Sequence, residues 1–78
     1  MLFDYVVLGN TIRDVRRERG LSQEVLSGLA GIARTHLTMI ENGTMHPTIE
    51  TLCKIAQALD LHTSELLAIM EAQIKPGE

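Results

Sequence analysis

The sequence is poor in cysteine, proline and aromatic residues, with one Cys, two Pro, one Tyr, one Phe and no Trp in 78 residues. Because Cys53 has no second thiol in the chain, neither an internal disulfide nor a cysteine-based zinc ribbon can form. The length allows one small globular domain over residues 1–78 and excludes a large multi-domain enzyme. A chain this short builds a marginal core, so self-association would add stability.

Long hydrophobic runs are also missing. No window approaches the ~20 uncharged apolar residues that a membrane span needs. Residues 1–8 include Asp4 and lack both the basic start and the small-residue cleavage site of a signal peptide. We therefore expect a cytoplasmic protein that has no membrane partner.

The chain has no excess of basic residues. Seven Lys and Arg oppose ten Asp and Glu, for a net charge of −3, which argues against a protein that coats nucleic acid non-specifically. Residues 1–43 contain five bases and five acids, whereas residues 44–78 contain two bases and five acids. We expect any polyanion to contact the first half of the chain.

Apolar residues recur at helical spacing almost throughout, and no stretch combines polar–apolar alternation with many β-branched residues. We therefore predict an all-α chain with five helices, at about residues 4–20, 22–31, 33–42, 48–59 and from 63 or 64 to 74. The predicted helix starts are capped by Asp4, Ser22 and Thr48. Gly20, Gly31 and the Asn42-Gly43 pair are suited to end helices.

Each predicted helix has one apolar face that we expect to be buried. The expected core consists of Leu8, Ile12 and Val15; Val25, Leu26, Leu29 and Ala30; Leu37 and Ile40; Ile49, Leu52, Ile55, Ala56 and Leu59; and Leu66, Leu67, Ile69, Met70 and Ile74. We expect residues 75–78 to be frayed, and we find no internal repeat or linker.

Residues 22–43 have the spacing of a helix-turn-helix, because two short predicted helices are joined at 31–33. Gly31 permits the positive φ of a sharp turn, and Ser27 is small where the helices approach each other. The residues that face each other across the turn are all apolar: Leu26, Ala30, Ile32, Leu37 and Ile40. Any helical hairpin could meet some of these demands. The residues on either side of this segment make the pattern more specific for a helix-turn-helix.

These flanks extend the pattern over about residues 8–68. They read Leu8-Gly9-Asn10-Thr11-Ile12-Arg13, Arg16-x-x-Arg19-Gly20-Leu21-Ser22-Gln23, Ile40-Glu41-Asn42-Gly43, Pro47-Thr48-Ile49-Glu50-Thr51-Leu52 and Ile55-Ala56-Gln57-Ala58-Leu59. In these residues the chain resembles the Xre/Cro/phage-repressor helix-turn-helix family. The resemblance implies a five-helix, λ-repressor-like DNA-binding domain, usually dimeric, with the third helix in the major groove.

The same resemblance assigns roles to individual residues. It places base reading on the third helix, at Arg34, Thr35 and Thr38, with His36 nearby. Arginine can present two parallel donors to guanine O6 and N7, which discriminates by ~1–3 kcal/mol. DNA-backbone contacts are implied at Ser22, Gln23, Asn42 and Thr44, with Arg13 as a further candidate.

Arg16 and Glu41 match a pair that forms an ion pair beneath the recognition helix in relatives, so we expect both to be structural. The chain departs from the family pattern twice. Ala33 replaces a common Ser or Thr N-cap, at a cost of ~1 kcal/mol. Met39 stands where some relatives have a polar base-contacting residue. We therefore expect the third helix to read bases directly over a narrower range than in those relatives.

Other candidate sites favour structural interpretations. Cys53 is expected to be a buried, inert thiol. The histidines lack the spacing of a metal site, so we expect no metal and no cofactor. No glycine-flanked serine elbow is present and the chain is small, which argues against an enzyme and a small-molecule ligand. A charged stripe on the first helix is either a phosphate-facing patch or a solvated face: Arg13, Arg17 and Arg19.

The leading hypothesis is a sequence-specific, double-stranded-DNA-binding transcriptional regulator. It would bind as a homodimer to two inverted half-sites about one helical turn (~34 Å) apart. Small phage repressors, restriction–modification controllers and antitoxins all fit this description. We expect the fifth helix to contribute most of the dimer interface, through Leu66, Ile69, Met70 and Ile74. The alternative is a protein-interaction module, such as an antitoxin, that binds a protein partner through its apolar surface.

Overall fold

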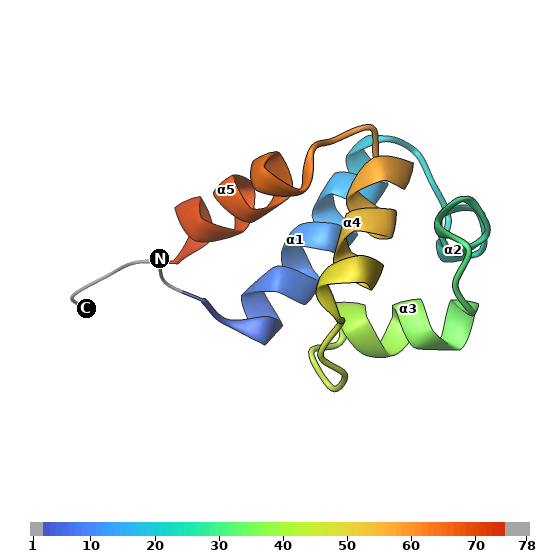
Figure 1. Cartoon of the computed structure of the whole chain (residues 1–78), viewed down its shortest axis with the longest axis horizontal. Helices are drawn as coiled ribbons and strands as arrows, with labels where there is room; N and C mark the ends of the chain where they lie inside the picture. The colour runs from blue at the N-terminus through green and yellow to red at the C-terminus, as the bar shows by residue number, and fades with distance from the viewer. Residues whose placement is uncertain (1–2, 75–78) are drawn as a thin grey trace.

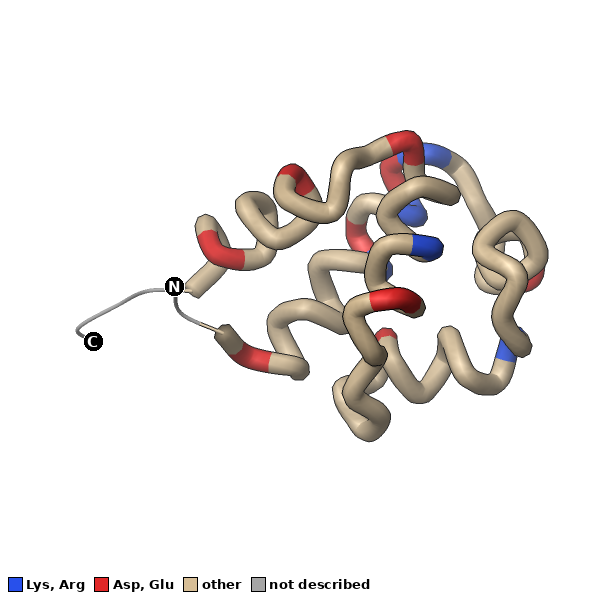
Figure 2. The backbone as a smooth tube through the Cα atoms, viewed as in Figure 1, with Lys and Arg blue, Asp and Glu red and all other residues tan. Residues whose placement is uncertain are grey.

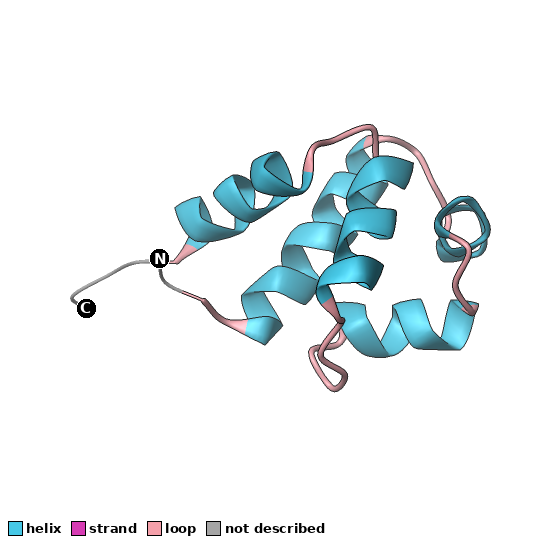
Figure 3. Cartoon of the chain, in the orientation of Figure 1, coloured by secondary structure: helices cyan, strands magenta, loops and turns pink. Residues whose placement is uncertain are grey.

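The computed structural model describes residues 3–74, which form five helices. These are α1 (Tyr5–Glu18), α2 (Gln23–Ala30), α3 (Arg34–Glu41), α4 (Ile49–Ala58) and α5 (Thr63–Gln73). Short loops join them, and residues 3–74 contain no strand (Figure 3). The prediction of an all-α, five-helix chain is confirmed. The frayed end predicted at 75–78 lies outside the described residues.

Local sequence sets most of the helix ends. Asp4, Ser22 and Thr48 each accept a hydrogen bond from a backbone N–H in the first turn of α1, α2 and α4. Ala33 precedes α3 and makes no such bond, so that helix starts without a side-chain cap. Gly31 follows α2 with φ 71°, the left-handed conformation that glycine adopts without steric cost.

The helices enclose one hydrophobic core. Helix α1 packs against α3 and α5, while α2 packs against α3 and α4. Figure 1 shows α2 and α3 at one end of the molecule and α5 at the other. The buried apolar residues come from every helix: Leu8, Ile12, Val15, Leu26, Ala30, Leu37, Ile40, Leu52, Ile55, Ala56, Leu59, Leu66 and Met70. No helix within residues 3–74 is long and apolar enough to cross a membrane.

Five residues predicted to be buried are exposed, and one of them is Ile69 on α5, at 36% exposed. Val25 and Leu29 are 48% and 63% exposed, because the buried side of α2 runs through residues 26, 27 and 30. Ile49 is 73% exposed at the first residue of α4, ahead of the turn that packs on the core. The prediction of a buried thiol was also wrong: Cys53 is exposed, one residue, or about 100°, around the helix from buried Leu52.

Candidate nucleic-acid interface

The α2–turn–α3 segment presents α3 along one edge of the molecule. In Figure 1, α2 is viewed along its axis while α3 lies across the picture, so the two helices cross steeply. The turn is closed by bonds from Gly31 N–H to the Gly28 carbonyl (3.2 Å) and from Ile32 N–H to the Ser27 carbonyl (3.0 Å). Ile32 is half-buried against the core. The crossing therefore fixes where the outer face of α3 points.

This outer face of α3 contains the residues assigned to base reading. Arg34 and Thr35 are exposed, and His36 and Thr38 are half-buried, whereas the opposite side of α3 is part of the core. Between Arg34 and Glu41, at its two ends, α3 has no charged residue (Figure 2). An α-helix with its side chains is about 10–12 Å across, and the major groove of B-DNA is about 12 Å wide. Its dimensions suit that groove.

A buried carboxylate holds α3 against the two preceding helices. Glu41 is 1% exposed, and its Oε2 accepts a hydrogen bond from Arg16 Nε at 2.8 Å. Its Oε1 accepts from a terminal guanidinium nitrogen of Arg16 at 3.1 Å and from Gln23 Nε2 at 3.0 Å. The charge is thus paired and its oxygens are hydrogen-bonded, which burial requires. Arg16 and Glu41 join α1 to α3, and Gln23 adds α2.

Arg13 strengthens the same junction. A terminal nitrogen of its guanidinium donates to the Glu41 backbone carbonyl at 2.8 Å, and its Nε lies 3.8 Å from Glu41 Oε1. Its side chain is 28% exposed, so part of the guanidinium also faces solvent beside the end of α3. The sequence suggested a DNA contact or a solvated face for Arg13 and did not indicate this structural role.

Gly9 makes a second contact that was not predicted from the sequence. A Cβ at this buried position would lie 2.4 Å from the Ile40 carbonyl oxygen and 2.6 Å from that of Glu41. Backbone atoms of α1 and α3 can approach this closely only where α1 has no side chain. The one available signal was a glycine inside a strongly helical pattern, because such a residue costs helix stability unless packing requires it.

The start of α2 presents backbone donors next to α3. Ser22 Oγ accepts from Val25 N–H at 3.1 Å, and the Gln23 side chain points inward to Thr38 and Glu41. The first N–H groups of a helix have no intrahelical partner, and the helix dipole favours an anion there. The backbone at Gln23, rather than its amide side chain, is therefore the group suited to a phosphate.

The loop after α3 is fixed against α1. His46 stacks on Tyr5 with ring centroids 3.6 Å apart and planes 5° apart. Gly43 has φ 76° and lies against Val6. Thr44 Oγ1 donates to the Met39 carbonyl at 3.1 Å, and both Asn42 and Thr44 are exposed. The two assigned backbone-contact residues thus stand on a loop with a defined position.

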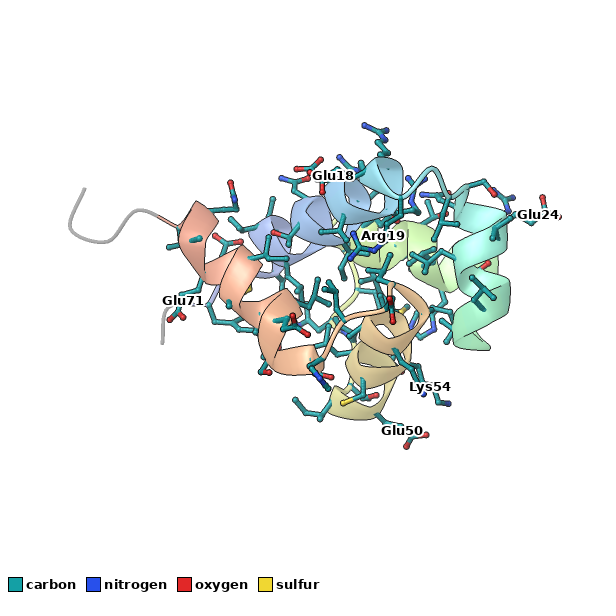
Figure 4. All side chains as sticks on the ribbon, turned by 90° about the horizontal axis from the view of Figure 1, so that it is seen from above. Glu18, Arg19, Glu24, Glu50, Lys54 and Glu71 are labelled. Carbon is teal, nitrogen blue, oxygen red and sulfur yellow. The ribbon has the colours of Figure 1, made fainter. Side chains whose placement is uncertain are left out.

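The arginines predicted to form a charged stripe on the first helix lie in different environments. Arg19 lies between the ends of α1 and α4 (Figure 4), where its Nε donates to the Leu59 carbonyl. Arg17 is exposed. A continuous phosphate-facing patch is therefore not formed, because Arg13 and Arg19 both donate to backbone carbonyls of their own chain.

Two of the expected dimer residues face the core. Leu66 and Met70 are 0% exposed, so neither can contact a second copy. Ile69 is exposed and Ile74 is half-buried. In the part of the chain that the structure describes, no three His, Cys, Asp or Glu side chains come together in a group that could hold a metal ion.

A family model described as Helix-turn-helix matches residues 12–66. The chain belongs to the helix-turn-helix family. It is 36% identical over 61 residues to an uncharacterised HTH-type transcriptional regulator of Sinorhizobium fredii, covering 78% of this chain and 79% of that protein. It is also 36% identical over 73 residues to the ImmF control region 10 kDa protein of Bacillus phage phi105, covering 94% and 80%.

Among solved structures, the helix-turn-helix domain resembles the restriction-modification controller protein C.AhdI from Aeromonas hydrophila. The two share 36% sequence identity with a TM-score of 0.79, over 81% of this chain and 96% of that one. The family match, together with this similarity of fold, confirms the resemblance to Xre/Cro/phage-repressor regulators that the sequence motifs indicated.

Proposed function

We propose that this helix-turn-helix protein is a sequence-specific, DNA-binding transcriptional regulator that inserts α3 into the major groove. The observation that carries the proposal is the buried Glu41, which ties the end of α3 to α1 and α2 and leaves the opposite face of α3 open. A reading helix needs such fixed support, because base contacts depend on side chains held in defined positions. The relatives, described as regulators, support this function.

Within this function, Arg34 is the main base-reading residue. It is exposed at the first residue of α3, the end that enters the groove in helix-turn-helix proteins. Its planar guanidinium suits guanine O6 and N7. Thr35 and His36 reach neighbouring base edges from the same turn.

Phosphate contacts flank the reading helix on both sides. The helix start at Ser22 and Gln23 supplies backbone N–H groups, and the loop residue Asn42 supplies a side-chain donor beside the exposed Thr44. The solvent-facing part of Arg13 adds a charge near this loop. These contacts set the position of α3 on the duplex without reading sequence.

We further propose that the protein acts as a homodimer on inverted half-sites. An apolar groove of about 310 Å³ lies where the starts of α1 and α4 meet α5, with Phe3 and Ile49 exposed at its rim. Its lining residues are Phe3, Tyr5, Leu8, Pro47, Ile49, Leu52 and Leu67. A second copy seated in this groove would cover these exposed apolar side chains. We place the site of action in the cytoplasm, because the relatives are proteins of bacteria and of their phages.

A protein-binding role is the second candidate. Val25 and Leu29 form an exposed apolar pair on α2, and residues 44–78 have two bases against five acids. An interface of this kind would respond little to salt, whereas DNA binding through phosphates weakens as salt rises. The two functions can therefore be separated by measurement.

Selection of bound duplexes from a random DNA pool by the purified protein tests the proposed function. We expect enrichment of a motif with two inverted half-sites, with their centres about 34 Å apart. A parallel selection without protein controls for amplification bias. Recovery of no enriched motif would contradict the proposal and favour the protein-binding alternative.

A further inference from the structure

The Glu41 carboxylate determines how the Gln23 amide is turned. Gln23 Nε2 lies 3.0 Å from Glu41 Oε1, and a carboxylate that is already paired with Arg16 only accepts hydrogen bonds. The nitrogen of the amide must therefore face Glu41, and the amide oxygen must face the other way. That oxygen, Gln23 Oε1, lies 2.9 Å from Thr38 Oγ1.

Thr38 thus has two protein acceptors and one proton to donate. Its Oγ1 is 2.9 Å from Gln23 Oε1 and 3.0 Å from the Arg34 backbone carbonyl. Neither oxygen has a proton to give, so the hydroxyl hydrogen of Thr38 points to one of them and not away from the protein. The half-buried side chain offers its surroundings only an oxygen lone pair and a methyl group.

We infer that Thr38 reads DNA as a hydrogen-bond acceptor and selects a base with an amino group in the major groove. Adenine presents its N6 amino group there and cytosine its N4 amino group, whereas guanine and thymine present only acceptors on this edge. The inference rests on the proposed function, since it requires α3 to lie in the major groove. Glu41 and Gln23 are positioning residues in this scheme, acting through Thr38.

Two variants separate the hydroxyl of Thr38 from its methyl group. Thr38→Val keeps the branched shape and removes the oxygen, while Thr38→Ser keeps the oxygen and removes the methyl group. Random-pool selection with wild type and both variants, followed by affinity measurements on the enriched duplexes, identifies the base pair that depends on Thr38. Replacing adenine there by purine, or cytosine by 2-pyrimidinone, removes the proposed donor and adds no other hydrogen-bonding group.

We expect wild type and Thr38→Ser to bind most tightly when one base pair in each half-site has its amino group, on adenine or on cytosine, on one fixed strand. Thr38→Val should bind the selected duplex about threefold to tenfold more weakly than wild type. Wild type should bind the amino-deficient duplex more weakly by the same factor. Thr38→Val should bind both duplexes with equal affinity. Unchanged preference at the other positions of the motif shows that α3 is still in place in the variant.

Three results would overturn the inference. Removing the amino group at the altered base pair could leave the affinity of wild type unchanged, which would make the hydroxyl a donor or the methyl group the reader. The Thr38→Val motif could equal that of wild type, which would remove Thr38 from base reading while leaving the proposed function intact. If wild type itself enriched no motif, the proposed function would fail and the inference with it.

Discussion

At the scale of single residues, Glu41 is the point where the first three helices meet. Its carboxylate accepts from Arg16 on α1 and Gln23 on α2, and its backbone carbonyl accepts from Arg13. The pairing of residues 16 and 41 could be expected from the family resemblance. The donors from residues 13 and 23 could not, because their positions depend on how three helices cross and not on spacing along the chain.

Replacing Glu41 by Ala should strongly destabilise the domain. Arg16 is 8% exposed and would be left as a buried charge without its partner, which costs ~3–5 kcal/mol. Urea unfolding followed by circular dichroism measures the change in free energy. The matched control is Glu50→Ala, because Glu50 pairs with Lys54 at 3.3 Å on the exposed side of α4 (Figure 4). That pair should contribute less than about 1 kcal/mol, and equal losses from both variants would contradict the structural role of Glu41.

Replacing Arg34 by Ala should change specificity more than stability. The guanidinium is exposed, and losing a bidentate contact to guanine should relax preference at one base pair in each half-site by ~1–3 kcal/mol. Asn42→Ala is the comparison, since loss of a phosphate contact should weaken binding to all sequences about equally. Competition binding against duplexes with single base changes distinguishes the two patterns. An Arg34→Ala protein with an unaltered preferred sequence would show that another residue reads the base.

At the scale of elements, sequence predicts the helices better than the faces they bury. The caps at Asp4, Ser22 and Thr48 and the turn at Gly31 are local, so each could be located from residue type alone. Burial of α2 depends on which neighbours cover it. Leu29 is as apolar as Leu26, but the packing against α3 and α4 covers only the side of Leu26.

The packing of α1 on α3 makes Gly9→Ala an unusual substitution. Alanine normally stabilises a helix relative to glycine by roughly 0.5–1 kcal/mol, but here its Cβ would meet two backbone carbonyl oxygens of α3. We expect a net loss of about 1–3 kcal/mol and a displaced reading helix. Gly28→Ala in α2 is the control, because nothing lies within 4 Å of its Cβ position. Thermal unfolding should show opposite shifts for the two variants, and stabilisation by Gly9→Ala would disprove the close approach.

At the scale of the whole molecule, charge and apolar surface are distributed around the reading face. Arg13 and Arg34 are the arginines that flank α3 at its two ends, while the apolar groove lies where α4 begins and α5 passes. Composition showed the charge asymmetry between the halves of the chain. Composition could not show that Leu66 and Met70 are fully buried in the core, because their burial depends on how α5 packs against the other helices.

The groove at Ile49 gives a test of the proposed dimer. Ile49→Glu would place a charge at the rim of this groove, where burying it against a second copy without a partner is costly. Sedimentation velocity over a range of protein concentrations should show a dimer for wild type and a monomer for this variant. Leu29→Glu alters a similarly exposed apolar residue on α2 and should remain dimeric. Dissociation by Leu29→Glu but not by Ile49→Glu would place the interface on α2 instead.

The measurement that tests the central claim most directly is the affinity of the protein for its selected duplex and for a scrambled one at several salt concentrations. Fluorescence anisotropy should show the selected duplex bound at least about a thousandfold more tightly at physiological salt. With Arg13 as a phosphate-facing arginine in each copy, log K should fall linearly with log salt with a slope of about −2 or steeper. Equal affinity for both duplexes, or binding that does not respond to salt, would contradict sequence-specific DNA recognition by this protein.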